Sequence, residues 1–232
     1  MKTLIVSATE KETNLLVQKT NNLRKVGQWL NSGNIGNTEV DFLISGIGLP
    51  SVIYRLTVLL SKEKYDLVIN PGIAGSFRDD LKIGTVVYVS KEQFGDLGID
   101  DNCEQRSLFE MGYVDPNSTP FSGGKLINPI DILKFKTLVS LPKVNSLTVN
   151  MASGNQTDIA NRWTKFSSDI ETMEGAGIFY VCILQNVPFI EIRAISNKIE
   201  PRNVKNWNIP LALTNLSDVL SKLFNEFDQR KQ

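Results

Sequence analysis

The run "DLVINPGIAGSF", residues 66–77, decides the expected fold because it joins an apolar strand signal to a glycine-rich segment. Residues 66–70 indicate a strand around the apolar stretch at 67–69, which is typical of a strand buried on both faces of a sheet. The two glycines that follow let the backbone approach a ligand closely. The segment lacks the Gly-Lys-Ser/Thr ending of a phosphate-binding P-loop.

Similar strand signals alternate with helical segments on both sides of this run. Further strands are expected at 3–8, 84–90, 144–150, 168–173 and 188–196, with two more inside 28–45 around a turn at 33–37. Helices are expected near 10–20, after Pro50, and at 156–165, 175–186 and 210–230. This alternation indicates an α/β fold with a mostly parallel sheet covered on both faces. Residues 95–128, rich in turn-forming residues, are expected to be an excursion that serves as a lid or subunit contact.

Length and charge limit the class of protein. The 232 residues suit one domain spanning 1–232, although two small domains would also fit. Net charge is zero, and no basic tract suggests a nucleic-acid or membrane partner. The first residues carry too short an apolar run for a signal peptide, so we expect a cytoplasmic protein.

The absence of histidine narrows the possible chemistry. It excludes Ser-His-Asp triads, Cys-His dyads and histidine-based zinc sites, so acid–base catalysis would fall mainly to carboxylates. No metal or cofactor is implied. Cys103 and Cys182 form no C-x-x-C pair, and we expect free buried thiols rather than a disulfide.

Glycines and carboxylates recur directly after the expected strands. The segments concerned are "SATEKE" at 7–12, "SGIG" at 45–48, "PGIAGSF" at 71–77, "MEGAG" at 173–177 and "SN" at 196–197. Ligands in α/β proteins bind beyond the carboxyl ends of strands. We therefore expect these segments to form one pocket for a small polar ligand.

Each candidate residue also has an ordinary structural interpretation. Glu12 and Thr9 fit a helix capping box as well as a catalytic base. "SGIG" is a weak match to a dinucleotide fingerprint, because Ser51 stands where that motif has Gly or Ala, and a tight strand-to-helix turn explains it as well. Glu174 either opposes a helix dipole or accepts hydrogen bonds from sugar hydroxyls. The glycines after it fit close helix packing.

The same holds for three residues near the end of the last strand. Asn197 could be a turn residue, Arg193 a structural ion-pair partner, and Trp207 a cover for the core. Their clustering at one expected sheet edge favours a functional site.

Taken in order, "SGIG", "NPGIAGSF", "ETMEGAG" and "RAISN" resemble the purine nucleoside phosphorylase and nucleosidase superfamily over nearly the whole chain. The resemblance implies a three-layer α/β/α sandwich around a mixed, partly closed sheet. Within the superfamily, "EKE" at 10–12 and "ME" at 173–174 are similar to the methylthioadenosine/S-adenosylhomocysteine nucleosidase type.

That branch implies roles for individual residues. Glu12 would activate water, Glu174 would bind the ribose hydroxyls beside Met173, and Arg193 would lie near the catalytic water. Gly72 and Ile73 would contact substrate, and Ala152, within "VNMASG" at 149–154, would belong to the base pocket. The resemblance also implies a homo-oligomer.

The chain departs from that branch at Asn197, where the adenine nucleosidases carry Asp. An asparagine amide can donate to purine N7 or to a 6-oxo group, but it is no comparable proton donor. Asn197 therefore favours hypoxanthine or guanine over adenine. Ile73 is a second departure, because these nucleosidases usually have a small hydroxyl residue in the glycine segment.

With these departures, "GIAGSF" and "RAISNKIEPRNVKNWNIPLAL" (193–213) are most similar to the futalosine hydrolase family. This resemblance implies hydrolysis of futalosine to hypoxanthine and dehypoxanthine futalosine in menaquinone biosynthesis. Phe77 or Trp207 would line a pocket for the 5′ substituent, and Arg202, or secondarily Arg78, would bind its carboxylate. Alternatives are a nucleosidase or phosphorylase acting on methylthioadenosine, S-adenosylhomocysteine or inosine, and a nucleoside-binding module without turnover.

Overall fold

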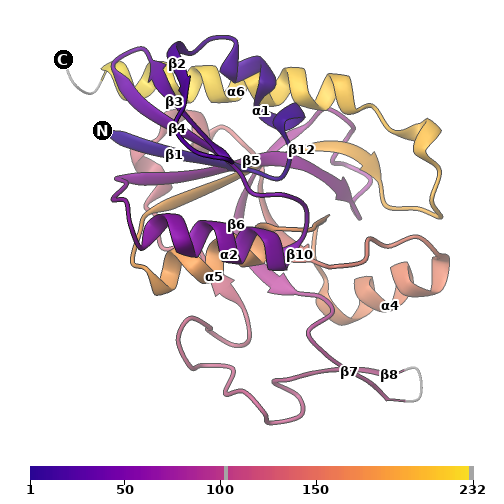
Figure 1. Cartoon of the computed structure of the whole chain (residues 1–232). Coiled ribbons are helices and arrows are strands. Elements are labelled where there is room, and N and C mark those ends of the chain that lie inside the picture. Colours follow the sequence, from indigo (N-terminus) through magenta and orange to yellow (C-terminus); the bar gives the residue numbers. More distant parts are fainter. Residues whose placement is uncertain (102–103, 230–232) are drawn as a thin grey trace.

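The computed structural model describes residues 1–101 and 104–229, and within them a mixed ten-stranded sheet lies between two helical layers (Figure 1). The strands of the long sheet follow the expected apolar runs, with additions near the N-terminus and at 126–127. They are β1 (Lys2–Ser7), β2 (Asn21–Lys25), β3 (Leu30–Ile35), β4 (Thr38–Ile44), β5 (Leu67–Ser76), β6 (Val86–Phe94), β9 (Leu126–Ile127), β10 (Lys143–Thr148), β11 (Ile170–Thr172) and β12 (Phe189–Lys198).

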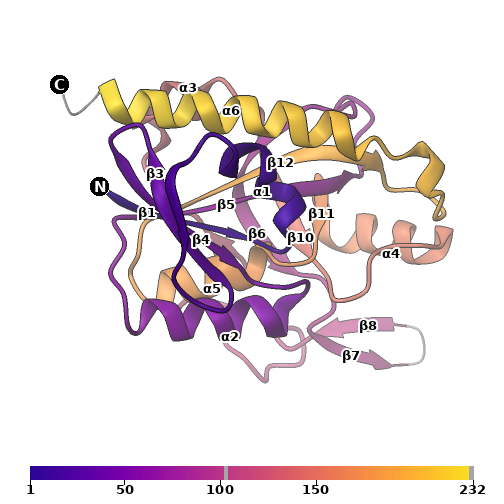
Figure 2. The ribbon, with the colours of Figure 1, turned by 45° about the horizontal axis from the view of Figure 1, so that its top comes forward.

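The helices cover both faces of this sheet, as the sequence predicts (Figure 2). One layer contains α1 (Glu10–Val17), α3 (Lys136–Val139) and α6 (Ile209–Gln229), and the other contains α2 (Leu49–Leu60) and α5 (Gly175–Leu184). Helix α4 (Gln156–Phe166) lies beside the second layer. The described residues also form two short 3-10 helices, η1 (Ile132–Lys134) and η2 (Val204–Asn206).

The sheet closes partly on itself. Its order is β11-β10-β6-β12-β5-β1-β4-β3-β2, and β11 also pairs with β5, so five strands form a closed circuit. Pairing is antiparallel where β12 meets β6 and where β11 meets β5. The prediction of a mostly parallel sheet from the apolar runs is therefore wrong in part. The mixed, partly closed sheet that the family resemblance implies is confirmed.

Two strands extend through segments that the sequence suggests are loops. β5 continues through the glycine segment to Ser76, and β12 continues through Asn197 to Lys198. A register shift between Ile195 and Asn197 places a bulge at Ser196, opposite the end of β5. The two segments can stay extended because each completes the other's ladder of backbone hydrogen bonds.

Two apolar clusters hold the layers together. On one face, α6 packs Leu216, Leu220 and Phe224 against the sheet, at the spacing of one helix face. On the other face, α2 and α5 pack against each other. A Cβ on Gly177 would lie 2.9 Å from Val52 Cγ1, so the expected close helix packing is confirmed at this glycine.

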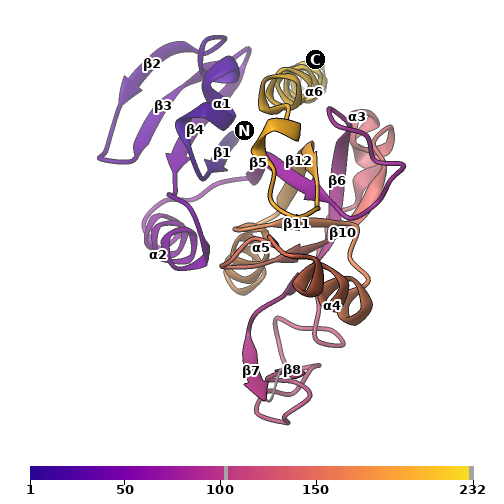
Figure 3. The ribbon, with the colours of Figure 1, turned by 90° about the vertical axis from the view of Figure 1, so that its right-hand side faces the viewer.

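Between Gly95 and Lys125 the described residues leave the sheet and form a projection (Figure 3), which packs Phe121 against Tyr180 of α5. It contains the hairpin of β7 (Gly98–Asp101) and β8 (Glu104–Ser107) and returns through β9. Cys182 is a buried free thiol, as expected, whereas Cys103 lies outside the described residues. No helix in the described part of the chain is both long and apolar enough to span a membrane.

Candidate active site

A cavity of about 400 Å³ opens where β1, β5, β11 and β12 end. Side chains from six separate parts of the chain line it. They include Thr9, Lys11, Glu12, Ile47, Ile73, Ala152, Ser153, Glu171, Met173, Glu174, Ser196, Asn197, Arg202 and Trp207. Eight of the ten residues proposed from the sequence therefore line one cavity, and Gly72 and Arg193 lie behind its wall.

Glu12 combines the two interpretations that the sequence leaves open. The Thr9 amide donates to Glu12 Oε2 at 3.0 Å, which is the capping contact at the start of α1. Glu12 Oε1 accepts from the Ile73 amide at 3.3 Å, and the half-buried carboxylate lines the cavity. The cap thus holds the carboxylate in one orientation at the cavity wall.

Glu174 stands at the N-terminus of α5 and is 7% exposed. Burial raises the pKa of its carboxyl, while the Arg193 charge and the Gly48 amide act in the opposite direction. Gly48 donates to Glu174 Oε1 at 2.8 Å from a backbone with φ +87°, a conformation that favours glycine. "SGIG" therefore forms the strand-to-helix turn, and it orients Glu174.

Arg193 is 2% exposed and is held from two sides. Its Nε donates to Glu191 Oε1 at 2.7 Å, and Nη2 donates to Asn70 Oδ1. A Cβ on Gly72 would lie 1.9 Å from Arg193 Nη1 and 2.9 Å from Glu12 Oε1. Gly72 thus leaves space for the guanidinium and the Glu12 carboxylate to lie side by side.

Asn197 lies at the cavity with its amide oriented by neighbours. Its Oδ1 accepts from the Ser196 hydroxyl at 2.8 Å, and Nδ2 donates to the Lys198 carbonyl at 3.0 Å. Because Nδ2 carries two hydrogens, one N–H remains for a ligand.

The outer part of the cavity carries an aromatic ring and two cations. The Arg202 guanidinium lies 5.4 Å from the centre of the Trp207 ring, and Lys11 lines the same cavity. Neither cation has an ion-pair partner among the residues that the structure describes. Lys198, by contrast, pairs with Asp79.

Three further residues lie outside the cavity. Phe77 packs on Trp163 with ring centres 5.9 Å apart, and Arg78 pairs with Asp80 and Asp169. The expected alternatives for the 5′ pocket are therefore wrong for these two residues. Arg55 stacks on Trp29 at 4.1 Å and donates to the Ile44 carbonyl.

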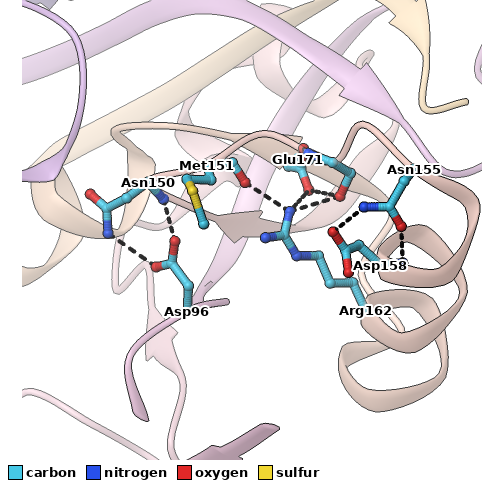
Figure 4. A network of polar contacts seen from close by, with 8 residues as sticks. Asp96, Asn150, Met151, Asn155, Asp158, Arg162 and Glu171 are labelled. Atoms are coloured by element: carbon cyan, nitrogen blue, oxygen red, sulfur yellow. Dashed lines mark hydrogen bonds and ion pairs between the residues drawn. The ribbon is translucent and has the colours of Figure 1, made fainter. Parts of the chain in front are cut away.

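A buried ion pair between Arg162 and Glu171, not expected from the sequence, lies at the cavity wall (Figure 4). Arg162 Nη1, from α4, donates to Glu171 Oε2 at 3.0 Å and to the Met151 carbonyl at 2.9 Å. Glu171 in turn accepts from the Ser153 amide at 2.8 Å and from its hydroxyl at 2.6 Å. The pair fixes the backbone of the segment proposed to contact the base.

Buried carboxylates within apolar strand runs are the signal that could have identified such residues. Glu191 carries this signal, because it interrupts the apolar run at 189–195, whereas Glu92 and Glu171 stand in more polar segments. Glu12 and Glu174 at the cavity, with Arg193 behind its wall, suit a reaction that develops positive charge on a bound sugar.

Comparison with known sequences gives a family match over most of the chain. A sequence profile described as the phosphorylase superfamily matches residues 2–225. The 5′-methylthioadenosine/S-adenosylhomocysteine nucleosidase of Maridesulfovibrio salexigens is 31% identical over 208 residues, which cover 86% of this chain and 87% of the relative.

Solved structures share the fold. The methylthioadenosine/S-adenosylhomocysteine nucleosidase of Colwellia psychrerythraea 34H, in complex with adenine, superposes with a TM-score of 0.82 at 21% identity, covering 97% of this chain and 95% of that one. The futalosine hydrolase of Helicobacter pylori strain 26695 superposes with a TM-score of 0.81 at 18% identity, covering 97% and 98%.

Proposed function

The chain belongs to the phosphorylase superfamily, among its nucleosidases, and we propose that residues 1–232 form a single domain that hydrolyses futalosine to hypoxanthine and dehypoxanthine futalosine, in menaquinone biosynthesis. The observation that carries the choice of base is the orientation of Asn197. Its amide oxygen already accepts from the Ser196 hydroxyl, and Nδ2, with one hydrogen bond to the Lys198 carbonyl, keeps one N–H that can donate to a ligand. Purine N7 and a 6-oxo group both accept hydrogen bonds, whereas the 6-amino group of adenine needs an acceptor.

The mechanism assigns a role to each wall of the cavity. Glu12 accepts a proton from water as the water oxygen attacks C1′ and the bond from C1′ to the base breaks. The electron pair of that bond leaves with the base, and the hypoxanthine anion takes its proton from solvent. Glu174 accepts hydrogen bonds from the ribose hydroxyls, and both carboxylates stabilise the positive charge that develops on the sugar. Asn197 orients the departing hypoxanthine, and Arg193 is proposed to lie next to the water through its Nη1.

Hydrolysis is favoured over phosphorolysis by the position of the arginines. Phosphate binding normally uses bidentate arginine contacts. Arg55 and Arg78, the arginines nearest the early glycine segments, are engaged with Trp29 and with two aspartates. Their guanidinium groups are therefore directed to protein partners.

Arg202 is proposed to bind the carboxylate of the 5′ substituent, with Trp207 beside its aryl ketone. Replacing Arg202 with Ala should raise KM for futalosine about tenfold more than KM for inosine, because inosine lacks that carboxylate. Steady-state kinetics with both substrates measures the difference, and Lys11→Ala is the matched control. Equal effects on both substrates, or a larger selective effect in the Lys11 variant, would reject this role for Arg202.

A second candidate substrate is 5′-methylthioadenosine or S-adenosylhomocysteine, which the name of the Maridesulfovibrio relative favours. Chromatography of reactions with futalosine, inosine and methylthioadenosine, each with and without phosphate, separates the possibilities. We expect rapid, phosphate-independent release of hypoxanthine from futalosine and slower release from inosine. Adenine release from methylthioadenosine would favour the second candidate, phosphate dependence would indicate a phosphorylase, and no free base would favour a binding module.

We also propose that the protein is a homo-oligomer in which residues 95–128 contact a second copy. Large exposed apolar side chains support this, among them Ile47 at the cavity and Tyr113 in the projection. Light scattering of the purified chain should give a mass of at least two copies, and a monomer at assay concentration would reject the proposal.

A further inference from the structure

Behind the cavity wall, Glu92 on β6 and Glu191 on β12 form a buried pair of acids that the mechanism above does not use. Both side chains are 0% exposed. A Cβ on Gly175 would lie 1.9 Å from Glu92 Oε1 and 2.6 Å from Glu191 Oε1. The two carboxyl groups therefore lie side by side, and the glycine that opens α5 is needed to make room for them.

The partners of the two acids differ. Glu191 Oε1 accepts from Arg193 Nε at 2.7 Å, but Oε2 has no hydrogen-bond donor within the described residues. Glu92 Oε2 accepts from the Thr148 hydroxyl at 2.9 Å, and Glu92 Oε1 accepts weakly from the Thr172 hydroxyl at 3.4 Å. Two ionised carboxylates this close would repel strongly in a buried site. A proton on Glu92 removes the repulsion and supplies a donor for Glu191.

The charges around the pair favour that distribution of protons. Burial raises the pKa of both carboxyl groups, and the neighbouring Glu191 charge raises that of Glu92 further. Arg193, which donates directly to Glu191, opposes the effect of burial there and favours the ionised form of Glu191. The other charged groups nearby are the Glu174 and Glu12 carboxylates, which both act on Arg193. Burial and the Glu191 charge raise the pKa of the Tyr88 hydroxyl, so Tyr88 stays neutral.

We propose that Glu92 and Glu191 share one proton and one negative charge, and that this single anion is a positioning unit that fixes the Arg193 guanidinium beside Glu12. The role for Arg193 rests on the proposed function, whereas the shared proton does not. With Nε held by Glu191 and Nη2 by Asn70, Nη1 makes no hydrogen bond within the described residues. Nη1 lies next to the space that it shares with Glu12, where a water molecule would accept its hydrogen bond.

Glutamine substitutions test the charge count. In Glu92→Gln the amide can donate to Glu191 as the protonated acid does, so kcat should stay within about threefold of wild type. In Glu191→Gln the anion moves to Glu92, and kcat should fall by up to about tenfold. The double variant leaves no anion, and kcat should fall about tenfold more than the product of the single effects, with little change in KM.

Infrared spectroscopy tests the shared proton without reference to activity. Wild type should show a protonated carboxyl absorption at neutral pH that Glu92→Gln removes. Asp41→Asn is the matched control, because Asp41 is another buried acid, bonded to Tyr65 and remote from Arg193. It should leave both the absorption and kcat unchanged.

Three outcomes would overturn the inference. They are the absence of that absorption in wild type, its persistence in folded Glu92→Gln, and multiplicative effects of the two substitutions on kcat. If no substrate is turned over, the proposed function fails, while the infrared result still decides whether the proton is shared.

Discussion

Replacing Glu12 with Gln should lower kcat by about 100- to 10,000-fold, the usual contribution of a positioned general base. Glutamine keeps the shape of the side chain, but its amide cannot take a proton from water. One oxygen remains to accept from Thr9, so the capping contact and the fold should survive. Substrate binding should therefore remain measurable. Single-turnover release of hypoxanthine, with calorimetric titration of substrate, measures both effects.

Glu10→Gln is the control for this experiment, because Glu10 is an exposed acid in the same first helical turn. It removes a similar charge from the start of α1 and should leave kcat nearly unchanged. Near-normal turnover in Glu12→Gln would return Glu12 to a purely structural capping role.

Replacing Asn197 with Asp should move the preference between hypoxanthine and adenine nucleosides by roughly 100-fold toward adenine, as a ratio of kcat/KM values. A carboxylate accepts from the 6-amino group and, when protonated, donates to N7. It also leaves a 6-oxo group facing an acceptor. Competition assays with inosine and adenosine, resolved by chromatography of the free bases, measure the ratio.

Asn186→Asp provides the matched control, because Asn186 is exposed on the loop after α5 and lies outside the cavity. It introduces the same charge and should leave the ratio unchanged. An unaltered base preference in Asn197→Asp would mean that Asn197 does not read the purine edge.

Much of the site could be predicted because the chain returns to the same sheet edge several times. Glu12, Glu174 and Asn197 are far apart in sequence, yet each follows or ends an apolar strand run. Strand ends meet at the cavity, so local pattern was enough to bring these residues together. The choice between cap and base at Glu12 could not be made locally, because one side chain does both tasks.

Other assignments failed because they depend on partners distant in sequence. Arg78 follows the glycine segment, but its guanidinium forms an ion pair with Asp169, near the start of β11, and does not line the cavity. Phe77 is likewise taken up by Trp163 of α4. Asp169 and Trp163 cannot be identified from the residues around 77, although Asp80, which also pairs with Arg78, is close in sequence.

The sequence by itself determined the alternation of strands and helices, the exclusion of histidine chemistry and the residues at the ends of β1, β11 and β12. These follow from local periodicity and turn chemistry. Only the tertiary structure decided how the sheet closes through β11 and β5, and which buried acids meet. In the sequence Gly175 is only a glycine at the start of a helix. In the fold its missing side chain leaves room for the carboxyl groups of Glu92 and Glu191. Such pairings depend on the register of strands that are far apart in sequence. A buried charge without a partner is costly, so each buried acid needs a partner, and the fold supplies it from a distant part of the chain.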